Sequence, residues 1–167
     1  QENSTQARTV LVEHLDDDRG NAVRLRASPG SLKAEGLIPM FVNSDVIAVP
    51  FHYDLVTVPS TASFLMFIDR LRKAVGGQMK ARLFIIPNLH DGRVGKRSEL
   101  ELWENTGKTF ANYGLVTDKI PKRADMERFS TVAELDMQAA IVSPVFDRIY
   151  AGIFGDGSPQ TLNHQQP

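Results

Sequence analysis

Apolar residues gather into short runs that are separated by polar segments rich in glycine and proline. Three of these runs, residues 9–12, 46–50 and 82–87, have the length of a strand and are rich in valine, leucine and isoleucine. A fourth and less apolar run, residues 115–120, ends at Pro121. The run at 46–50 is apolar throughout, which is typical of a strand covered on both faces of a parallel sheet. The pattern predicts four strands.

The segments between the predicted strands repeat apolar residues at helical spacing. In residues 60–75 the repeat predicts an amphipathic helix, with Ser60 as its N-cap and Gly76 as its stop. Similar patterns predict helices over residues 32–42, 99–113 and 131–150.

This alternation of strands and helices favours βαβ units. We therefore expect an α/β fold with three layers and a doubly wound, mostly parallel sheet. No internal repeat or long linker divides the sequence, so we expect one domain over residues 1–155. Residues 156–167 are rich in glycine, serine, proline, glutamine and asparagine, and we expect a disordered tail there.

Composition narrows the class of protein. The 167 residues are 42% hydrophobic and 23% charged, which is ordinary for a globular domain, and the net charge is −1. The absence of cysteine excludes disulfides, thiolate metal sites and cysteine nucleophiles. We expect neither a signal peptide nor a membrane span, because no apolar run approaches the roughly 20 residues that a spanning helix needs. A cytoplasmic location follows as an expectation.

Polar residues are dense where the predicted strands end. In open parallel sheets, ligands bind beyond the carboxyl ends of the strands. The corresponding segments are residues 13–21, 50–54, 87–97 and 121–125. The sequence therefore predicts the functional site in these loops.

The order of several short motifs resembles that of the deviant-Walker ATPases of the ParA/MinD type. Residues 10–22 are similar to the family's apolar strand and acidic Asp-x-Asp-x-x-Gly-Asn loop, and Pro29-Gly30 resembles its Pro-Gly turn. Residues 43–50 are similar to its "Ala-Asp, apolar run, Pro" strand. Residues 85–88 match the strand whose last asparagine reads adenine, and residues 120–125 fall where the family closes its adenine pocket.

The resemblance implies a P-loop NTPase-like fold and a role in plasmid or conjugative-element partition or transfer. It further implies ATP and Mg²⁺ as cofactors and dimerisation that depends on ATP. Asp17 would orient the attacking water, and Asn88, Pro121 and Gly30 would bind the nucleotide.

Basic residues beside these motifs are candidates for contact with DNA or with a DNA-bound adaptor protein. They are Arg93, Lys96, Arg97, Lys122 and Arg123.

The sequence departs from the family in the phosphate-binding loop and in a magnesium ligand. No Lys-Gly-Gly-x-Gly-Lys-Thr loop precedes Val10, and Ala27 stands where the family carries a magnesium-binding aspartate. The only Gly-Lys-Thr run, residues 107–109, falls inside a predicted helix, and we interpret it as unrelated to phosphate binding. The interval between Asn21 and Pro29 is also too short for the helix and strands expected there. We therefore expect that segments are missing from this sequence, and the roles of ATP and Mg²⁺ depend on them.

Two alternatives remain open. The first is a non-catalytic interaction module with the same fold. The second is a metal-dependent phosphohydrolase, because imidazole and carboxylate groups occur together at three predicted strand ends. These pairs are His14 with Asp16, His52 with Asp54, and His90 with Asp91. Simpler interpretations also stand: Asn88 as the cap of a turn, and Trp103 as a packing residue.

Overall fold

The computed structural model of the protein describes residues 11–16, 22–26, 36–93, 97–124, 126 and 136–155. Contacts divide the chain into two compact units, residues 1–41 and 42–167, and each unit is described by itself. The expectation of one domain over residues 1–155 remains a prediction. The tail at 156–167, Asp17, Ala27, Gly30 and Lys96 lie outside the described residues.

The first unit contains a two-stranded antiparallel sheet. Strand β1 (Leu11–Asp16) pairs with β2 (Ala22–Arg26), so that Leu11 lies opposite Arg26. The register shifts between Val12 and Leu15. The first predicted strand therefore pairs antiparallel, in a sheet separate from the parallel one, and its partner β2 was not predicted. Helix α1 (Leu37–Val42) follows and spans the boundary between the units.

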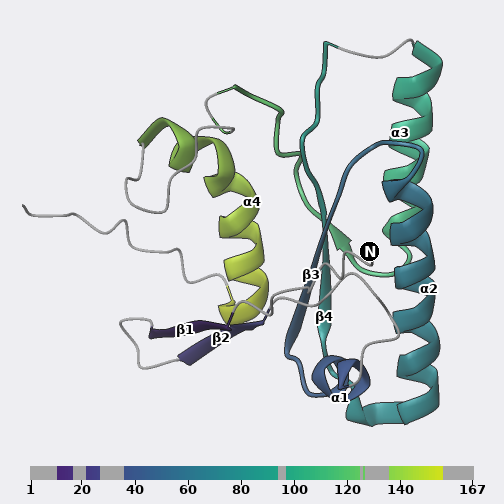
Figure 1. Cartoon of the computed structure of the whole chain (residues 1–167), viewed down its shortest axis with the longest axis vertical. Coiled ribbons are helices and arrows are strands. Elements are labelled where there is room, and N and C mark those ends of the chain that lie inside the picture. Colours follow the sequence, from purple (N-terminus) through teal and green to yellow (C-terminus); the bar gives the residue numbers. More distant parts are fainter. Residues whose placement is uncertain are drawn as a thin grey trace, which may run out of the picture. The chain divides into compact units, whose positions relative to one another are not determined.

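The second unit is built on a three-stranded parallel sheet (Figure 1). Its strands β3 (Val46–Phe51), β4 (Arg82–Pro87) and β5 (Leu115–Val116) lie side by side in sequence order. Helix α2 (Thr57–Val75) connects β3 to β4, and α3 (Arg97–Phe110) connects β4 to β5. The α/β class and these parallel pairings are confirmed, although β5 is shorter than the predicted strand.

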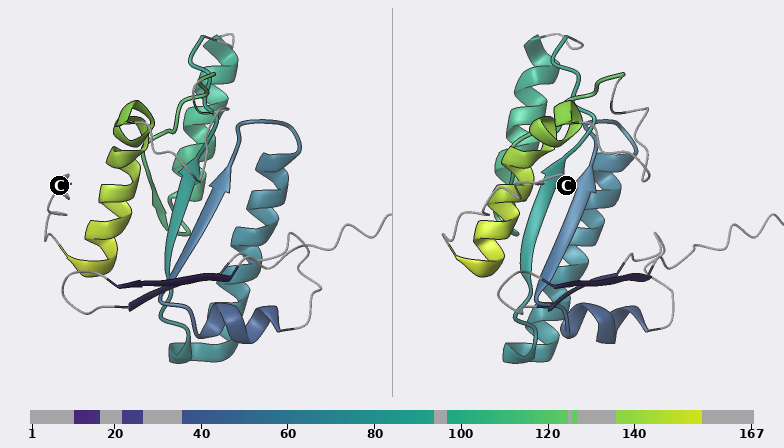
Figure 2. Two further views of the ribbon diagram at one scale, coloured as in Figure 1. Left: turned by 60° about the vertical axis from the view of Figure 1, so that its left-hand side comes forward. Right: turned by 90° about the vertical axis from the view of Figure 1, so that its left-hand side faces the viewer.

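Helices lie on both faces of this sheet. Figures 1 and 2 show α2 and α3 on one face and α4 (Asp136–Phe154) on the other. The rings of Phe51 and Phe110 meet edge to face at 5.1 Å between β3 and α3. On the opposite face, a side-chain carbon at Gly152 would lie 2.4 Å from the Phe84 ring, so α4 approaches β4 only because residue 152 is glycine.

The described core follows the alternation of the strands. In β3 the side chains at 47, 49 and 51 are buried, whereas Ala48 and Pro50 are exposed. In β4 all five side chains from Leu83 to Pro87 are buried. The central strand is therefore covered on both faces, and β3 on one.

Strand β3 forms an edge of the sheet in the described part of the chain. The carbonyl of Asp45 accepts a hydrogen bond from the N–H of Arg82 in β4. The carbonyl of Phe51 accepts one from the N–H of Asn88, just after β4. Because backbone direction alternates along a strand, the odd-numbered residues face β4 and Pro50 faces away from it. The missing N–H of Pro50 therefore costs the ladder nothing.

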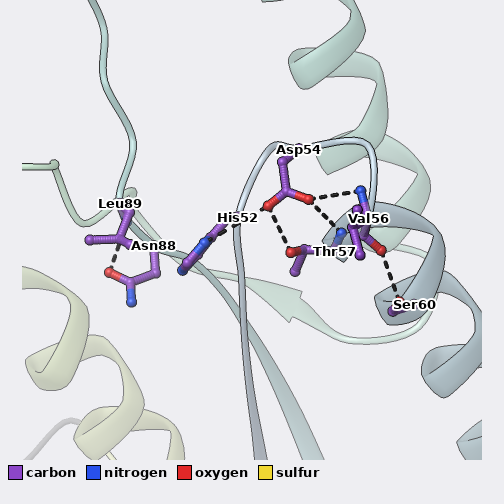
Figure 3. Close-up of polar contacts among 7 residues, drawn as sticks. All are labelled: His52, Asp54, Val56, Thr57, Ser60, Asn88 and Leu89. Atoms are coloured by element: carbon purple, nitrogen blue, oxygen red, sulfur yellow. Dashed lines mark hydrogen bonds and ion pairs between the residues drawn. The ribbon is translucent and has the colours of Figure 1, made fainter.

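The ends of α2 show which local signals decide a helix boundary. The Asp54 carboxylate accepts hydrogen bonds from the backbone N–H groups of Val56 and Thr57, at 2.8 and 2.6 Å (Figure 3). It also accepts one from the Thr57 hydroxyl at 2.7 Å. The predicted cap, Ser60, was wrong: its hydroxyl bonds back to the carbonyl of Val56, inside the first turn. Gly76 ends the helix with φ of 60°, as predicted.

Two further findings bear on the sequence-based expectations. Residues 107–109 lie inside α3, as predicted for the Gly-Lys-Thr run. Within the described ranges, no helix is long and apolar enough to cross a bilayer.

Candidate functional site

The carboxyl end of the three-stranded sheet brings two loops together. Beyond the strands, the N–H of Asn88 bonds the carbonyl of Phe51 at 2.7 Å, and the N–H of Ile120 bonds that of Pro87 at 2.8 Å. His90 and Pro121 then form a parallel bridge. The bridge consists of His90 N–H to the Ile120 carbonyl and Lys122 N–H to the His90 carbonyl, both at 2.9 Å. The segments around Asn88 and Pro121 are therefore neighbours, held by backbone bonds.

Asn88 is half-buried and its side chain already makes a local hydrogen bond. Its Oδ1 accepts a hydrogen bond from the N–H of Leu89 at 2.8 Å (Figure 3). Leu89 has φ of 52°, a left-handed conformation that is unusual for leucine and fits a tight turn. The Asn88 side chain thus bonds the backbone of the next residue, and its interpretation as a turn cap stays a prediction. A carbonyl oxygen has two lone pairs and the amide nitrogen two donors, so this bond leaves polar capacity for a ligand.

An open depression of about 680 Å³ lies beside this bridge. It contains Pro121 from the predicted nucleotide site, together with Arg93, Lys122 and Arg123 from the predicted DNA-contact set. The remaining lining residues are His90, Asp91, Gly92 and Ala124. The structure thus gathers residues that the sequence assigned to two different functions.

Arg97 takes no part in the depression. It lies in the first turn of α3, where its Nε pairs with Oε1 of Glu101 at 3.4 Å across one helical turn. Such an exposed pair contributes only tenths of a kcal/mol to helix stability.

Asp91 and Arg93 form a local pair at the rim of the depression. Asp91 Oδ1 accepts hydrogen bonds from the backbone N–H and Nε of Arg93, at 3.0 and 3.1 Å. Its Oδ2 lies 3.3 Å from Nη2 of the same side chain. The hydrogen bonds from Arg93 lower the pKa of Asp91 below its ordinary value, so the carboxylate is ionised at neutral pH.

An aromatic cluster, comprising Phe51, Tyr53, His90 and Trp103, lies at the same end of the sheet. Tyr53 stacks on Trp103 with 5.4 Å between ring centroids, and the His90 ring meets both edge-on. The Lys119 ammonium lies 5.6 Å from the centroid of Tyr53. The cluster therefore ties together the loops after β3, β4 and β5 and helix α3. Trp103 packs as predicted, but the cluster as a whole was not predicted.

His90 links the aromatic cluster to the depression. Burial lowers the pKa of His90 below its ordinary value of 6.5, and the Lys119 ammonium lowers it further, against an opposing effect of Asp91. The buried Nδ1 of His90 has no hydrogen-bond partner among the described residues. The ring is therefore held by aromatic contacts and is neutral at pH 7.

The carboxylate of the His52 and Asp54 pair already has a structural role at the start of α2. Their side chains approach to 3.9 Å, but both oxygens of Asp54 cap α2. Hydrogen bonds from Thr57, and then from Val56, lower the pKa of Asp54. In the parts of the chain that the structure describes, no three His, Cys, Asp or Glu residues gather as a metal site. Nothing in these residues favours the metal-dependent hydrolase.

No protein family, curated protein or solved structure matches the chain.

Proposed function

We propose that residues 1–155 form a ParA/MinD-type ATPase domain, or a fragment of one, acting in plasmid or conjugative-element partition or transfer. The proposal includes the three-layer, doubly wound P-loop fold of that family. Its main support is the bridge between His90 and Pro121, which makes the Asn88 and Pro121 loops neighbours beyond the sheet. Ligands of parallel sheets bind at this end.

Adenine recognition uses the free polar atoms of Asn88. An asparagine amide can donate to a ring nitrogen of adenine and accept from its exocyclic amine, which makes the pair bidentate. The second lone pair of Oδ1 remains for this contact, because the first accepts the N–H of Leu89. Pro121 offers an apolar surface beside the base.

The phosphate and magnesium half of the family's site is not matched by this chain. The sequence carries no glycine-rich lysine loop before Val10, and the described residues contain no cluster of three potential metal ligands. Asp17 lies outside the described residues. We therefore derive no hydrolytic step. Turnover of ATP, and a dimer controlled by it, depend on a phosphate-binding loop in the native protein.

The test is calorimetric binding of adenosine and guanosine. We expect a preference for adenosine, because guanosine reverses the donor and acceptor pattern at the exocyclic position. Asn88→Ala should lower adenosine affinity about ten-fold, as expected for one or two lost hydrogen bonds. Asn88→Asp keeps the acceptor for the N–H of Leu89 and loses the amide donor, so it should also weaken binding without unfolding the turn.

Asn112→Ala is the matched control, because Asn112 is an exposed asparagine that follows the C-terminal end of α3. Equal adenosine affinity for wild type, Asn88→Ala and Asn88→Asp would remove Asn88 from the site.

Exposed apolar side chains on α4 favour a second candidate, a non-catalytic interaction module with the same fold. Met137 and Phe146 are 68% and 56% exposed, and Val145 is the one apolar side chain of α4 among the buried core residues described. A helix this apolar usually buries more of its surface. The surface is suited to a protein partner.

A further inference from the structure

Three of the five cationic residues expected to contact DNA line a recess. Arg93, Lys122 and Arg123 come from two loops and surround one depression, together with Pro121. Its volume of about 680 Å³ is within the range of sites for small ligands. Binding of duplex DNA instead relies on many phosphate contacts spread along a surface. The shape therefore suits a compact anion.

The lining carries three cations and one carboxylate, Asp91, and Arg123 has an interaction of its own. Arg93 already pairs with Asp91, which cancels that negative charge and fixes the guanidinium at the rim. Lys122 forms no close ion pair with a described residue, although its charge helps to lower the pKa of Asp91. Lys122 consequently offers an exposed ammonium group to a ligand, and a phosphate group is the strongest acceptor for such a donor.

The walls of the recess are fixed before a ligand arrives. The two hydrogen bonds of the His90 and Pro121 bridge, each 2.9 Å between nitrogen and oxygen, hold the backbones of both loops together. The aromatic cluster holds the His90 side chain from the other side. Binding therefore orders little backbone, which lowers its entropic cost.

We propose that this recess binds the phosphate group of a small phosphorylated ligand, with Lys122 and Arg93 as direct contacts. The inference rests on the proposed function in one respect: the expected ligand is an adenine nucleotide whose base reaches Asn88 and Pro121.

The experiment compares adenosine, AMP and inorganic pyrophosphate by calorimetry at low salt. We expect AMP to bind at least about ten-fold more tightly than adenosine, since a charge-assisted phosphate contact is added. Pyrophosphate should bind alone and compete with AMP. Lys122→Gln should remove most of the difference between AMP and adenosine, and leave adenosine affinity unchanged.

Lys80→Gln is the matched control. Lys80 is an exposed lysine that precedes β4, at the amino end of the sheet and away from the recess. Its substitution should alter neither AMP nor pyrophosphate binding.

The outcomes separate the two proposals. If pyrophosphate binds through Lys122 but adenosine does not bind, the recess stands and the adenine site fails. If adenosine binds but AMP is no tighter and pyrophosphate does not bind, the recess is overturned. Duplex DNA that binds through Lys122 and is not displaced by pyrophosphate would also overturn it, in favour of an extended nucleic-acid surface.

Discussion

His90 occupies a position where one proton changes several contacts. Its ring touches Tyr53 and Trp103, and its backbone carries the bridge to Pro121. Burial and the nearby Lys119 keep the pKa of His90 below 6.5, so the neutral ring is the form that the fold accommodates. A charged imidazolium would lie beside a second cation in a partly desolvated place.

We expect this pKa shift to appear as a pH dependence of stability. Below about pH 6.5 the unfolded chain takes up the proton before the folded one, so His90 favours unfolding as the pH falls toward its folded pKa. Well above pH 6.5, His90 is neutral in both the folded and the unfolded chain, and its effect on the free energy of unfolding vanishes. Urea unfolding between about pH 7.5 and pH 5, with NMR titration of the imidazole, measures both quantities.

Lys119→Met should move the pKa of His90 back toward 6.5, because it removes the neighbouring positive charge. Lys80→Met should leave the titration unchanged. A His90 titration at or above 6.5 in the wild-type protein would contradict the burial of its ring.

At the scale of elements, the start of α2 depends on a capping side chain, Asp54, which precedes the helix by three residues. Asp54 satisfies two backbone N–H groups at the start of the helix. Asp54→Ala should lower the melting temperature by about 2–4 °C, the usual effect of losing an N-cap in a domain of this size. Thermal unfolding followed by circular dichroism measures the change.

Asp54→Asn separates the cap from the charge, because asparagine is an equally good N-cap without the carboxylate. It should retain most of the stability at neutral pH. An equal loss in Asp54→Ala and Asp54→Asn would assign the effect to the charge of Asp54, near His52, and not to the cap.

Element prediction succeeded where the pattern is local and strong. The runs at 46–50 and 82–87 are apolar almost throughout, and the helix before Gly76 repeats apolar residues over several turns. Strand β2 was missed although Ala22–Arg26 alternates apolar and basic residues, a pattern typical of an antiparallel strand. The expectation of a parallel fold obscured this alternation.

Prediction of the site was limited for a different reason. The neighbouring positions of Asn88 and Pro121 follow from a parallel sheet and could be expected. The aromatic cluster could not, because its rings come from three separate segments and no spacing in the sequence relates them. The recess likewise depends on the register of the His90 and Pro121 bridge, which only the folded chain defines.

At the scale of the whole molecule, the apolar surface of α4 distinguishes the two candidate functions. An ATPase of the proposed family would dimerise only with nucleotide, whereas an interaction module would associate through a permanent surface. Sedimentation of the full chain with and without ATP measures this difference.

We expect Phe146→Ser to weaken any association that does not need nucleotide, since Phe146 is an exposed aromatic side chain of α4. The substitution should not disturb the fold, because the Phe146 ring contributes little to the core. Tyr113→Ser, a partly buried aromatic after α3, is a comparison away from α4. A monomer that forms dimers only with ATP, equally in wild type and Phe146→Ser, would favour the ATPase.

Pro50 has a consequence for how copies of the molecule can associate. Strand growth at an open sheet edge needs an unbroken row of amide donors, and fibrillar aggregation uses such a row as its template. At the outer side of β3 the row is interrupted, since Pro50 has no amide proton to offer. Open-ended polymerisation through this edge is therefore disfavoured.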